Sequence, residues 1–296
     1  MKFSPESLDR SMIKPEGNIV DEKDIIDVDP DPENKKFETP VMVVQGWGRN
    51  GETFRKRPLE VLANQGRRVL AFDSPRKIKI DTEQLPPELP MEELQKAGAI
   101  IDVLNQKGIE KTDAIAWSEG GLNLAMAAYM HPERFRNLVL VEPAGMIGRD
   151  SLLGLAYRFC IKENRQSKIP RDESIIGFIK YIAAHPMMCL HEMKQISEAD
   201  IYELLKALKK AGIGISVVFG TSDQVFPMDR VQETYSGKRI NGTVEKSDDI
   251  LDGFYSVKGT HGEFIGHGEK LEPEVFPKAV GQILTALEKK TEKPKT

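Results

Sequence analysis

The sequence has little cysteine, no long apolar run and no excess of positive charge. Its 296 residues include 2 cysteines, Cys160 and Cys189, too few for a disulfide-stabilised scaffold, so a reducing, cytoplasmic setting is expected. No apolar run reaches the roughly 20 residues that cross a bilayer, and the first residues lack the apolar core of a signal peptide. The net charge of −4 gives no electrostatic argument for nucleic acid or an anionic membrane as a partner.

The composition is that of an ordinary globular protein. Hydrophobic residues make up 40% and charged residues 30% of the chain, which allows a packed core. The length suits one large domain, or one domain with an insertion. Residues 1–40 are weakly patterned and partly acid-rich. For them we expect an extended arm packed on the core, with one or two edge strands around Ile25–Val28; a loosely packed arm is the alternative.

From residue 41 onward, short apolar runs alternate with amphipathic segments. The runs predict strands at Val41–Val44, Arg68–Phe72, Ala114–Trp117, Leu138–Val141, Ile215–Phe219 and Phe254–Lys258. The amphipathic segments predict helices at Thr53–Gln65, Met91–Gln106, Glu119–Met130 and Val275–Leu287. This alternation predicts an α/β fold with a mostly parallel, doubly wound sheet.

The alternation stops after Gly145. The next segments have helical patterning, at Leu152–Cys160, Ile175–Ala184 and Ile201–Lys210. We therefore predict a helical cap at 146–212, inserted into an α/β core formed by 41–145 and 213–290. The apolar cap residues are expected to pack together and cover a pocket; they are Leu152, Leu153, Leu155, Phe159, Ile175, Ile176, Phe178, Ile179, Met187 and Met188.

Ser118 stands between a short apolar strand and a helix. Small residues lie two positions before it, at Ala116, and two positions after it, at Gly120. Such a sharp turn strains the serine backbone and exposes its hydroxyl at the carboxyl edge of a sheet, beside the first N–H groups of a helix. The pattern is G-x-S-x-G with alanine in place of the first glycine. It indicates a nucleophile, although an ordinary strand-to-helix turn is the alternative.

Two further polar residues follow late strands. Asp223 comes after the strand at 215–219, and His261 after the strand at 254–258. Ligands of open α/β sheets bind beyond the carboxyl ends of the strands, so Ser118, Asp223 and His261 are expected to meet there, in the chain order of one hydrolase architecture. His267 is the alternative to His261 as the catalytic histidine, and Glu142 is the alternative to Asp223 as the acid. A helix N-cap is the alternative role for Asp223.

These features together carry a family resemblance. From about Val41 to its last helix, the chain resembles the α/β-hydrolase superfamily, in particular its capped carboxylesterases and related small-substrate hydrolases. The resembling segments are Gln45–Gly48, Ala116–Gly121, His131–Phe135 leading into Leu138–Val141, Asp223 with Val225–Pro227, and Gly259–His261. The resemblance implies an oxyanion hole formed by the backbone N–H groups of Trp47 and Glu119.

Two segments depart from the superfamily's usual pattern. Gln45 stands where the first loop usually begins with histidine, and Asp73-Ser74-Pro75-Arg76 lacks the glycines usual after the next strand. Both departures concern the shape of loops beside the site.

The expected substrate pocket includes Gly46, Trp117, Met146, Phe226 and Phe264, and both tryptophans have core packing as the alternative role. His185, Cys189 and His191 lie close together in the sequence but lack a fourth zinc ligand, so no metal and no cofactor are predicted.

The predicted function is that of a serine hydrolase. Ser118 would attack, His261 would carry the proton, and Asp223 would orient the histidine. The favoured substrate class is a small to medium ester with an apolar acyl part, without nucleic acid or membrane partners, in a monomer or homodimer. Thioesterase, C–C hydrolase, aminopeptidase and lipase activities are alternatives, as is a non-catalytic ligand-binding role. Serine at position 118 argues against hydrolases that use an aspartate nucleophile there.

Overall fold

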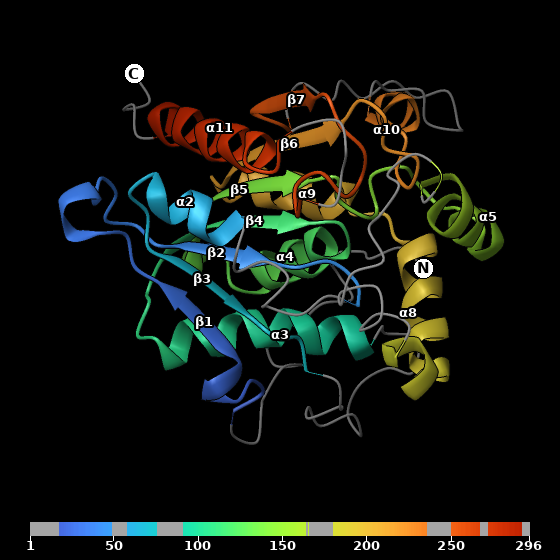
Figure 1. Ribbon diagram of the computed structural model, residues 1–296, viewed down its shortest axis with the longest axis horizontal. Coiled ribbons are helices and arrows are strands. Elements are labelled where there is room, and N and C mark those ends of the chain that lie inside the picture. Colours follow the sequence, from blue (N-terminus) through green and yellow to red (C-terminus); the bar gives the residue numbers. More distant parts are fainter. Residues whose placement is uncertain are drawn as a thin grey trace.

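The computed structural model describes residues 18–48, 58–75, 91–163, 165, 180–235, 250–266 and 272–291. Its centre is a seven-stranded sheet in the order β1-β3-β2-β4-β5-β6-β7 (Figure 1). The strands are β1 (Ile25–Val28), β2 (Val41–Val44), β3 (Val69–Phe72), β4 (Thr112–Trp117), β5 (Phe135–Val141), β6 (Gly214–Gly220) and β7 (Gly253–Val257). Every pairing is parallel except that of β1 with β3. The predicted α/β fold with a mostly parallel sheet is confirmed.

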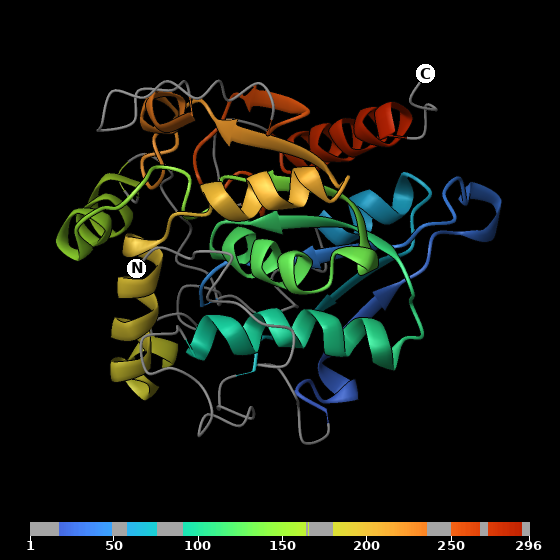
Figure 2. The same ribbon diagram turned by 180° about the vertical axis from the view of Figure 1, so that it is seen from behind.

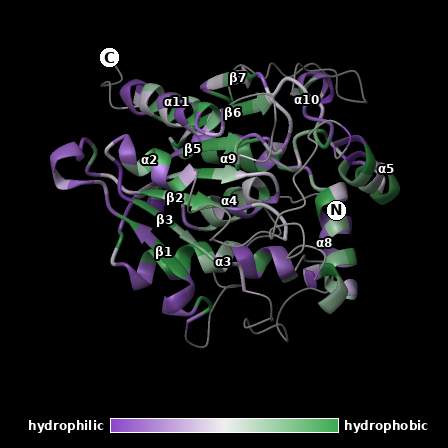
Figure 3. Cartoon of the chain, in the orientation of Figure 1, coloured by the Kyte–Doolittle hydropathy of each residue, from purple (hydrophilic) through white to green (hydrophobic). Residues whose placement is uncertain are grey.

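The inner strands are apolar on both faces because helices cover both sides of the sheet. On one face lie α3 (Met91–Gln106), α4 (Glu119–Met130) and α9 (Tyr202–Lys210), seen in front in Figure 2. On the other face lie α2 (Glu60–Asn64) and α11 (Val275–Thr291). Colouring by hydropathy places apolar residues along the strands and polar ones on the outer helix surfaces (Figure 3). This is the layered burial that parallel sheets require.

The part of the N-terminal arm that the structure describes packs on this core. Ile19 and Val20 are buried, and β1 adds an antiparallel edge strand with Ile25 opposite Phe72. The backbone N–H of Val20 donates to Asp102 in α3 over 2.8 Å. The expected edge strand at Ile25–Val28 is therefore present.

An inserted helical segment lies beyond the carboxyl ends of the strands (Figure 1). It contains α5 (Leu152–Tyr157), a π-helical turn (Arg158–Glu163) and α8 (Pro186–Glu198). Its two ends meet where the N–H of Ile201 donates to the carbonyl of Gly145 over 3.1 Å. Helix α9 instead packs on α4 and β6 in the core layer. We therefore propose that the cap spans 146–200, with α9 belonging to the core.

Sequence patterning located most elements and missed one. Helices α3 and α4 have the predicted bounds, and α9 and α11 differ by a few residues at one end. Of the helix predicted at 53–65, residues 53–57 lie outside the described part; a π turn at 58–59 leads into α2. Of the helix predicted at 175–184, only 180–184 is described, and it is helical. Helix α8 was not predicted.

The remaining elements are short. They are 3₁₀ turns at Glu22–Asp24, Pro32–Asn34 and Pro132–Arg134, and α10 (Met228–Tyr235). None of the helices in the described ranges is long and apolar enough to cross a membrane.

Candidate active site

Ser118 occupies a strained turn between β4 and α4. Its φ and ψ are 57° and −125°, outside the regions that non-glycine residues favour, and its N–H donates to the carbonyl of Val141 over 2.9 Å. A Cβ on Gly120 would lie 2.5 Å from the carbonyl oxygen of Gln45 and 2.7 Å from that of Val44. The chain crossing therefore requires glycine at 120, whereas alanine fits at 116.

Replacing Gly120 by alanine is expected to destabilise the fold by about 2–3 kcal/mol, because backbone atoms of β2 would have to move. Gly108→Ala is the matched control: its new Cβ meets no atom within 4 Å, so it should show only the cost of the φ of 62° there, about 1–2 kcal/mol. Urea denaturation of both variants compares the two values. A Gly120→Ala protein as stable as the wild type would contradict the crossing geometry.

Three side chains form a continuous hydrogen-bonded chain at the carboxyl edge of the sheet. The Oγ of Ser118 lies 3.0 Å from Nε2 of His261, and Nδ1 of the same histidine lies 2.9 Å from Oδ2 of Asp223. All three are largely buried, at 9%, 3% and 3% exposure. The ring of His261 is held between Trp117, with 5.2 Å between centroids, and Phe226, with 5.4 Å. The competing His267 lies outside the described residues.

Asp223 makes two kinds of contact at once. Its Oδ1 accepts the backbone N–H groups of Val225 and Phe226, over 2.7 and 3.0 Å, while Oδ2 faces the histidine. These contacts close a local turn before α10, which begins at Met228, so Asp223 does not take the helix N-cap role that was its alternative. The turn fixes the carboxylate and so fixes the direction in which Oδ2 points.

Glu142, the alternative to Asp223 as the acid, lies beside the same histidine. It follows β5 with a φ of 48°, and its Oε2 is 3.6 Å from Nδ1 of His261. It also accepts the backbone N–H of Gly220 over 2.9 Å and the indole N–H of Trp117 over 3.2 Å. Burial, and next the negative charge of Asp223, raise the pKa of Glu142 well above its usual range. The two donated N–H groups act in the opposite direction and lower this pKa.

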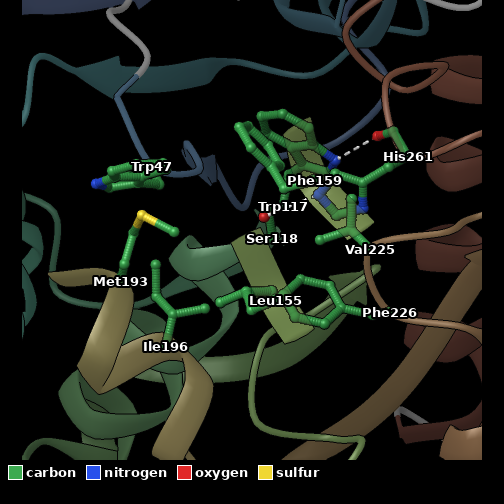
Figure 4. A pocket seen from close by; sticks show the side chains of 10 residues that line it. All are labelled: Trp47, Trp117, Ser118, Leu155, Phe159, Met193, Ile196, Val225, Phe226 and His261. Carbon is green, nitrogen blue, oxygen red and sulfur yellow. Dashed lines mark hydrogen bonds between the residues drawn. The ribbon is translucent and has the colours of Figure 1, made fainter. Parts of the chain in front are cut away.

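A small cavity lies above Ser118 and is closed by the cap. It encloses about 30 Å³, room for roughly two water molecules. Apart from Ser118 and His261 its lining is apolar; the lining residues are Trp47, Trp117, Leu155, Phe159, Met193, Ile196, Val225 and Phe226 (Figure 4). Leu155, Phe159, Met193 and Ile196 come from the cap, so the cap forms one wall of the cavity.

The predicted pocket residues divide between the lining and the core. Trp117 and Phe226 line the cavity. Gly46 packs behind it, because a Cβ there would lie 2.8 Å from both Cβ of Ser118 and Cε3 of Trp117. Met146 and Phe264 are fully buried in the core clusters on opposite faces of the sheet and do not line the cavity, which corrects that prediction. The sequence gives no signal that distinguishes an apolar loop residue that lines the cavity from one that packs in the core.

The prediction of which apolar cap residues cover the pocket is also only partly correct. Leu155 and Phe159 face the cavity, whereas Leu153 and Met187 are 82% and 63% exposed and point away from the core. Four other residues of that prediction, Ile175, Ile176, Phe178 and Ile179, lie outside the described ranges. The α8 residues Met193 and Ile196 were missed because the helix itself was missed.

The two predicted oxyanion residues lie on either side of Ser118. Trp47 is in the loop after β2, and its ring meets Phe159 edge-on at 5.9 Å between centroids. Glu119 is the first residue of α4, and its carboxylate contacts Lys96 rather than the cavity. Gln45, the first departure from the superfamily pattern, is buried, and its amide has no hydrogen-bond partner among the described residues. Of the second departure, residues 73–75 are described and Arg76 is not.

The three possible zinc ligands of the cap do not converge. Cys189 is buried, His185 precedes α8, and His191 is exposed with Nδ1 3.7 Å from Glu92. Within the described ranges, the group of potential ligand atoms close enough for one ion is Glu142, Asp223 and His261, which already hydrogen-bond to the groups named above.

A family sequence model for the alpha/beta hydrolase fold matches residues 39–162, which include β2, the Ser118 turn and the start of the cap. The chain has the α/β-hydrolase fold. The superfamily predicted from the sequence is thus confirmed at the level of the fold. Among curated proteins, none matches the chain by sequence.

Solved α/β-hydrolase structures agree with this chain over most of its length. A structure from work on carboxylesterases of the archaeon Nitrososphaera gargenis has a TM-score of 0.58 at 14% identity, covering 90% of this chain and 95% of the other. A bromoperoxidase from Bacillus anthracis has 0.58 at 16% identity, with 90% and 94% covered. A 2-hydroxy-6-oxo-6-phenylhexa-2,4-dienoate hydrolase from Rhodococcus has 0.59 at 18%, with 88% and 92% covered. Identities this low establish the fold alone.

Proposed function

We propose that this α/β-hydrolase is a serine hydrolase that cleaves small, uncharged carboxylic esters through an acyl-enzyme. The observation that carries the proposal is the hydrogen-bonded chain from Ser118 Oγ through His261 to Asp223. A serine hydroxyl is a weak nucleophile unless an adjacent base accepts its proton, and Nε2 of His261 is at hydrogen-bond distance for that transfer. Supporting observations are the positive φ of Ser118 and the apolar cavity above it.

The reaction follows from these positions. Ser118 Oγ attacks the ester carbonyl as His261 takes its proton, and the resulting imidazolium is stabilised by Asp223 through Nδ1–H. The negative charge that develops on the carbonyl oxygen is held by the backbone N–H groups of Glu119 and Trp47, each worth about 10²–10³ in rate. His261 then protonates the leaving alkoxide. Water attacks the acyl-Ser118 bond by the reverse proton path and releases the carboxylic acid.

The lining of the cavity favours an uncharged substrate. Among the described residues that form it, no lysine or arginine is present to pair with a substrate carboxylate. Two buried carboxyl groups, those of Asp223 and Glu163, instead lie close to His261 and oppose a further negative charge. A dienoate substrate of the kind named for the Rhodococcus structure carries such a charge. An apolar ester or thioester has none, and flat or branched acyl groups suit the aromatic walls.

A panel of p-nitrophenyl esters tests the substrate class. We expect kcat/KM to be highest for short or aromatic acyl groups, to fall by about tenfold or more for a 12-carbon acyl chain, and to be at least about 100-fold lower for a succinyl ester, whose free carboxylate must be desolvated. A short thioester is the added arm for thioesterase activity. Preference for the long chain or for the anionic ester would contradict the proposed substrate class.

A further inference from the structure

Two carboxylates of the cap reach the proposed catalytic groups from opposite sides. Glu163 ends the π-helical turn after α5, and Glu192 lies in α8. Both are almost fully buried, at 4% and 1% exposure. Burying a carboxylate is costly unless it is paired or hydrogen-bonded, so the partners of these two residues indicate what they are for.

Glu163 bridges the loops that carry Asp223 and His261. Its Oε1 accepts the backbone N–H of His261 over 2.9 Å, and its Oε2 accepts the backbone N–H of Gln224 over 3.1 Å. Gln224 directly follows Asp223 in the chain. The side chain of Glu163 therefore holds the loop that carries Asp223 at a fixed distance from the loop that carries His261. The 2.9 Å contact between Asp223 and His261 depends on that distance.

Glu192 makes the matching connection on the oxyanion side. Its Oε2 accepts the indole N–H of Trp47 over 2.7 Å, and its Oε1 lies 2.7 Å from the ammonium of Lys96. The same ammonium is 2.7 Å from Glu119. The side chains of both residues proposed to supply oxyanion donors, Trp47 and Glu119, are thus joined to the cap through one buried ion cluster. Tyr181 also donates to Glu192, over 3.0 Å to Oε2.

The ammonium of Lys96 lies among three carboxyl groups, those of Glu93, Glu119 and Glu192. Burial opposes the charged form of Lys96, but the carboxylates of Glu119, Glu93 and Glu192 hold its pKa well above the usual range. Burial, followed by the charge of Glu119, raises the pKa of Glu93 well above its usual range. If Glu192 loses its charge, Lys96 still keeps the carboxylate of Glu119 as a partner.

We propose that Glu163 and Glu192 are positioning residues through which the closed cap assembles the reacting groups, Glu163 on the histidine side and Glu192 on the oxyanion side. This proposal rests on the proposed serine-hydrolase function. Four residues that line the cavity beside Ser118 come from the cap, Leu155, Phe159, Met193 and Ile196. With the cap in this position, the two carboxylates hold the loop spacing and the Trp47 position, so catalysis is coupled to the placement of the cap.

Glutamine is the most informative substitution at both positions, because it keeps the shape of the glutamate side chain and replaces one accepting carboxylate oxygen by a donating NH₂ group. Glu163→Gln can accept only one of the two loop N–H groups, and Glu192→Gln loses the contact with either Trp47 or Lys96. Glu198→Gln, on the same helix α8 but outside both sets of contacts described above, is the matched control. We expect each cap variant to lower kcat by about ten- to hundredfold with KM changed by less than about threefold, while Glu198→Gln keeps wild-type values.

Amide hydrogen exchange provides a readout that does not depend on turnover. Glu163→Gln is expected to speed exchange at Gln224 and His261 by about tenfold or more, while amides in the sheet strands keep wild-type rates. Unchanged exchange at both amides would overturn the bridge. Faster exchange with kcat within about threefold of wild type would overturn the positioning role, and so would a loss of activity that follows a falling Tm.

The same design separates this proposal from the proposed function. If the wild-type protein cleaves no ester and its Ser118 does not react with a fluorophosphonate, the serine-hydrolase function is wrong. The exchange rates at Gln224 and His261 then still decide whether Glu163 holds the two loops. If the wild type is active and both cap variants keep the kcat and KM of the Glu198→Gln control, the serine-hydrolase function is supported and the positioning proposal is wrong.

Discussion

Ser118→Ala is expected to lower ester turnover by about 10⁴-fold or more while leaving the fold intact. The hydroxyl is the proposed nucleophile, and its removal leaves only the proposed oxyanion donors and the cavity to promote attack by water. His261→Ala should lose a similar factor. Because the two residues act as one unit, the double variant should be little worse than either single variant. Steady-state kinetics with p-nitrophenyl acetate measure all three.

Ser256→Ala, on the exposed strand β7, is the control serine for this comparison. It should keep wild-type turnover. Ser118→Ala should also keep close to wild-type stability, because alanine retains the Cβ and the strained backbone and removes only a nearly buried hydroxyl. A Ser118→Ala protein that retains more than about one tenth of the wild-type kcat/KM would contradict the role of the serine.

Asp223→Ala is expected to lower kcat by about 10³–10⁴ near neutral pH and to recover part of that loss as the pH rises. The reason is Glu142, whose Oε2 lies 3.6 Å from Nδ1 of His261. In the wild type, burial and then the charge of Asp223 hold the pKa of Glu142 well above its usual range. Removing Asp223 removes the second cause, so this pKa falls, and Glu142 becomes an anion as the pH increases.

The sign of the pH dependence distinguishes this account from a simple loss of the acid. Relative to wild type at each pH, activity of Asp223→Ala should rise by about tenfold as the pH increases and Glu142 loses its proton. The double variant Asp223→Ala with Glu142→Gln should show no such rise, because glutamine cannot ionise. An Asp223→Ala activity that stays constant or falls with pH, relative to wild type, would contradict the reserve role of Glu142.

The strands and the main helices were predictable because their residues lie in one repeating environment. Strand β2 is apolar at each of its four positions since helices cover both faces of the sheet, and a continuous apolar run is what such a strand produces. Helix α3 carries Glu92 and Glu93 in its first turn and is followed by Gly108 at a φ of 62°, which are usual features of helix ends. Local rules were sufficient there.

The order of Ser118, Asp223 and His261 was predictable for a related reason. Parallel strands bring the residues that follow them to one edge of the sheet, so three residues far apart in the chain become neighbours once the strands are located. The strained turn at Ser118 requires a small residue at 120, and the sequence has glycine there.

The buried charges were not predictable from local sequence. Lys96, Glu119 and Glu192 have the appearance of solvent-facing residues on amphipathic helices, yet each is less than 10% exposed because Lys96 pairs with both carboxylates across elements far apart in the chain. Helix α8 was missed for the same reason: besides the polar residues Glu192 and Ser197, its inner face carries only Cys189, Met193 and Ile196. Pairing of charges between distant elements leaves no periodic signal.

Covalent labelling tests the central claim most directly. The purified protein is treated with a fluorophosphonate, digested, and mapped by peptide mass, with Ser118→Ala treated in parallel. We predict one stoichiometric adduct, on Ser118, formed by the wild type and absent from the variant, because this hydroxyl lies 3.0 Å from Nε2 of His261 and next to the proposed oxyanion donors. An adduct on another residue, or none at all, would contradict the claim that Ser118 is an activated nucleophile.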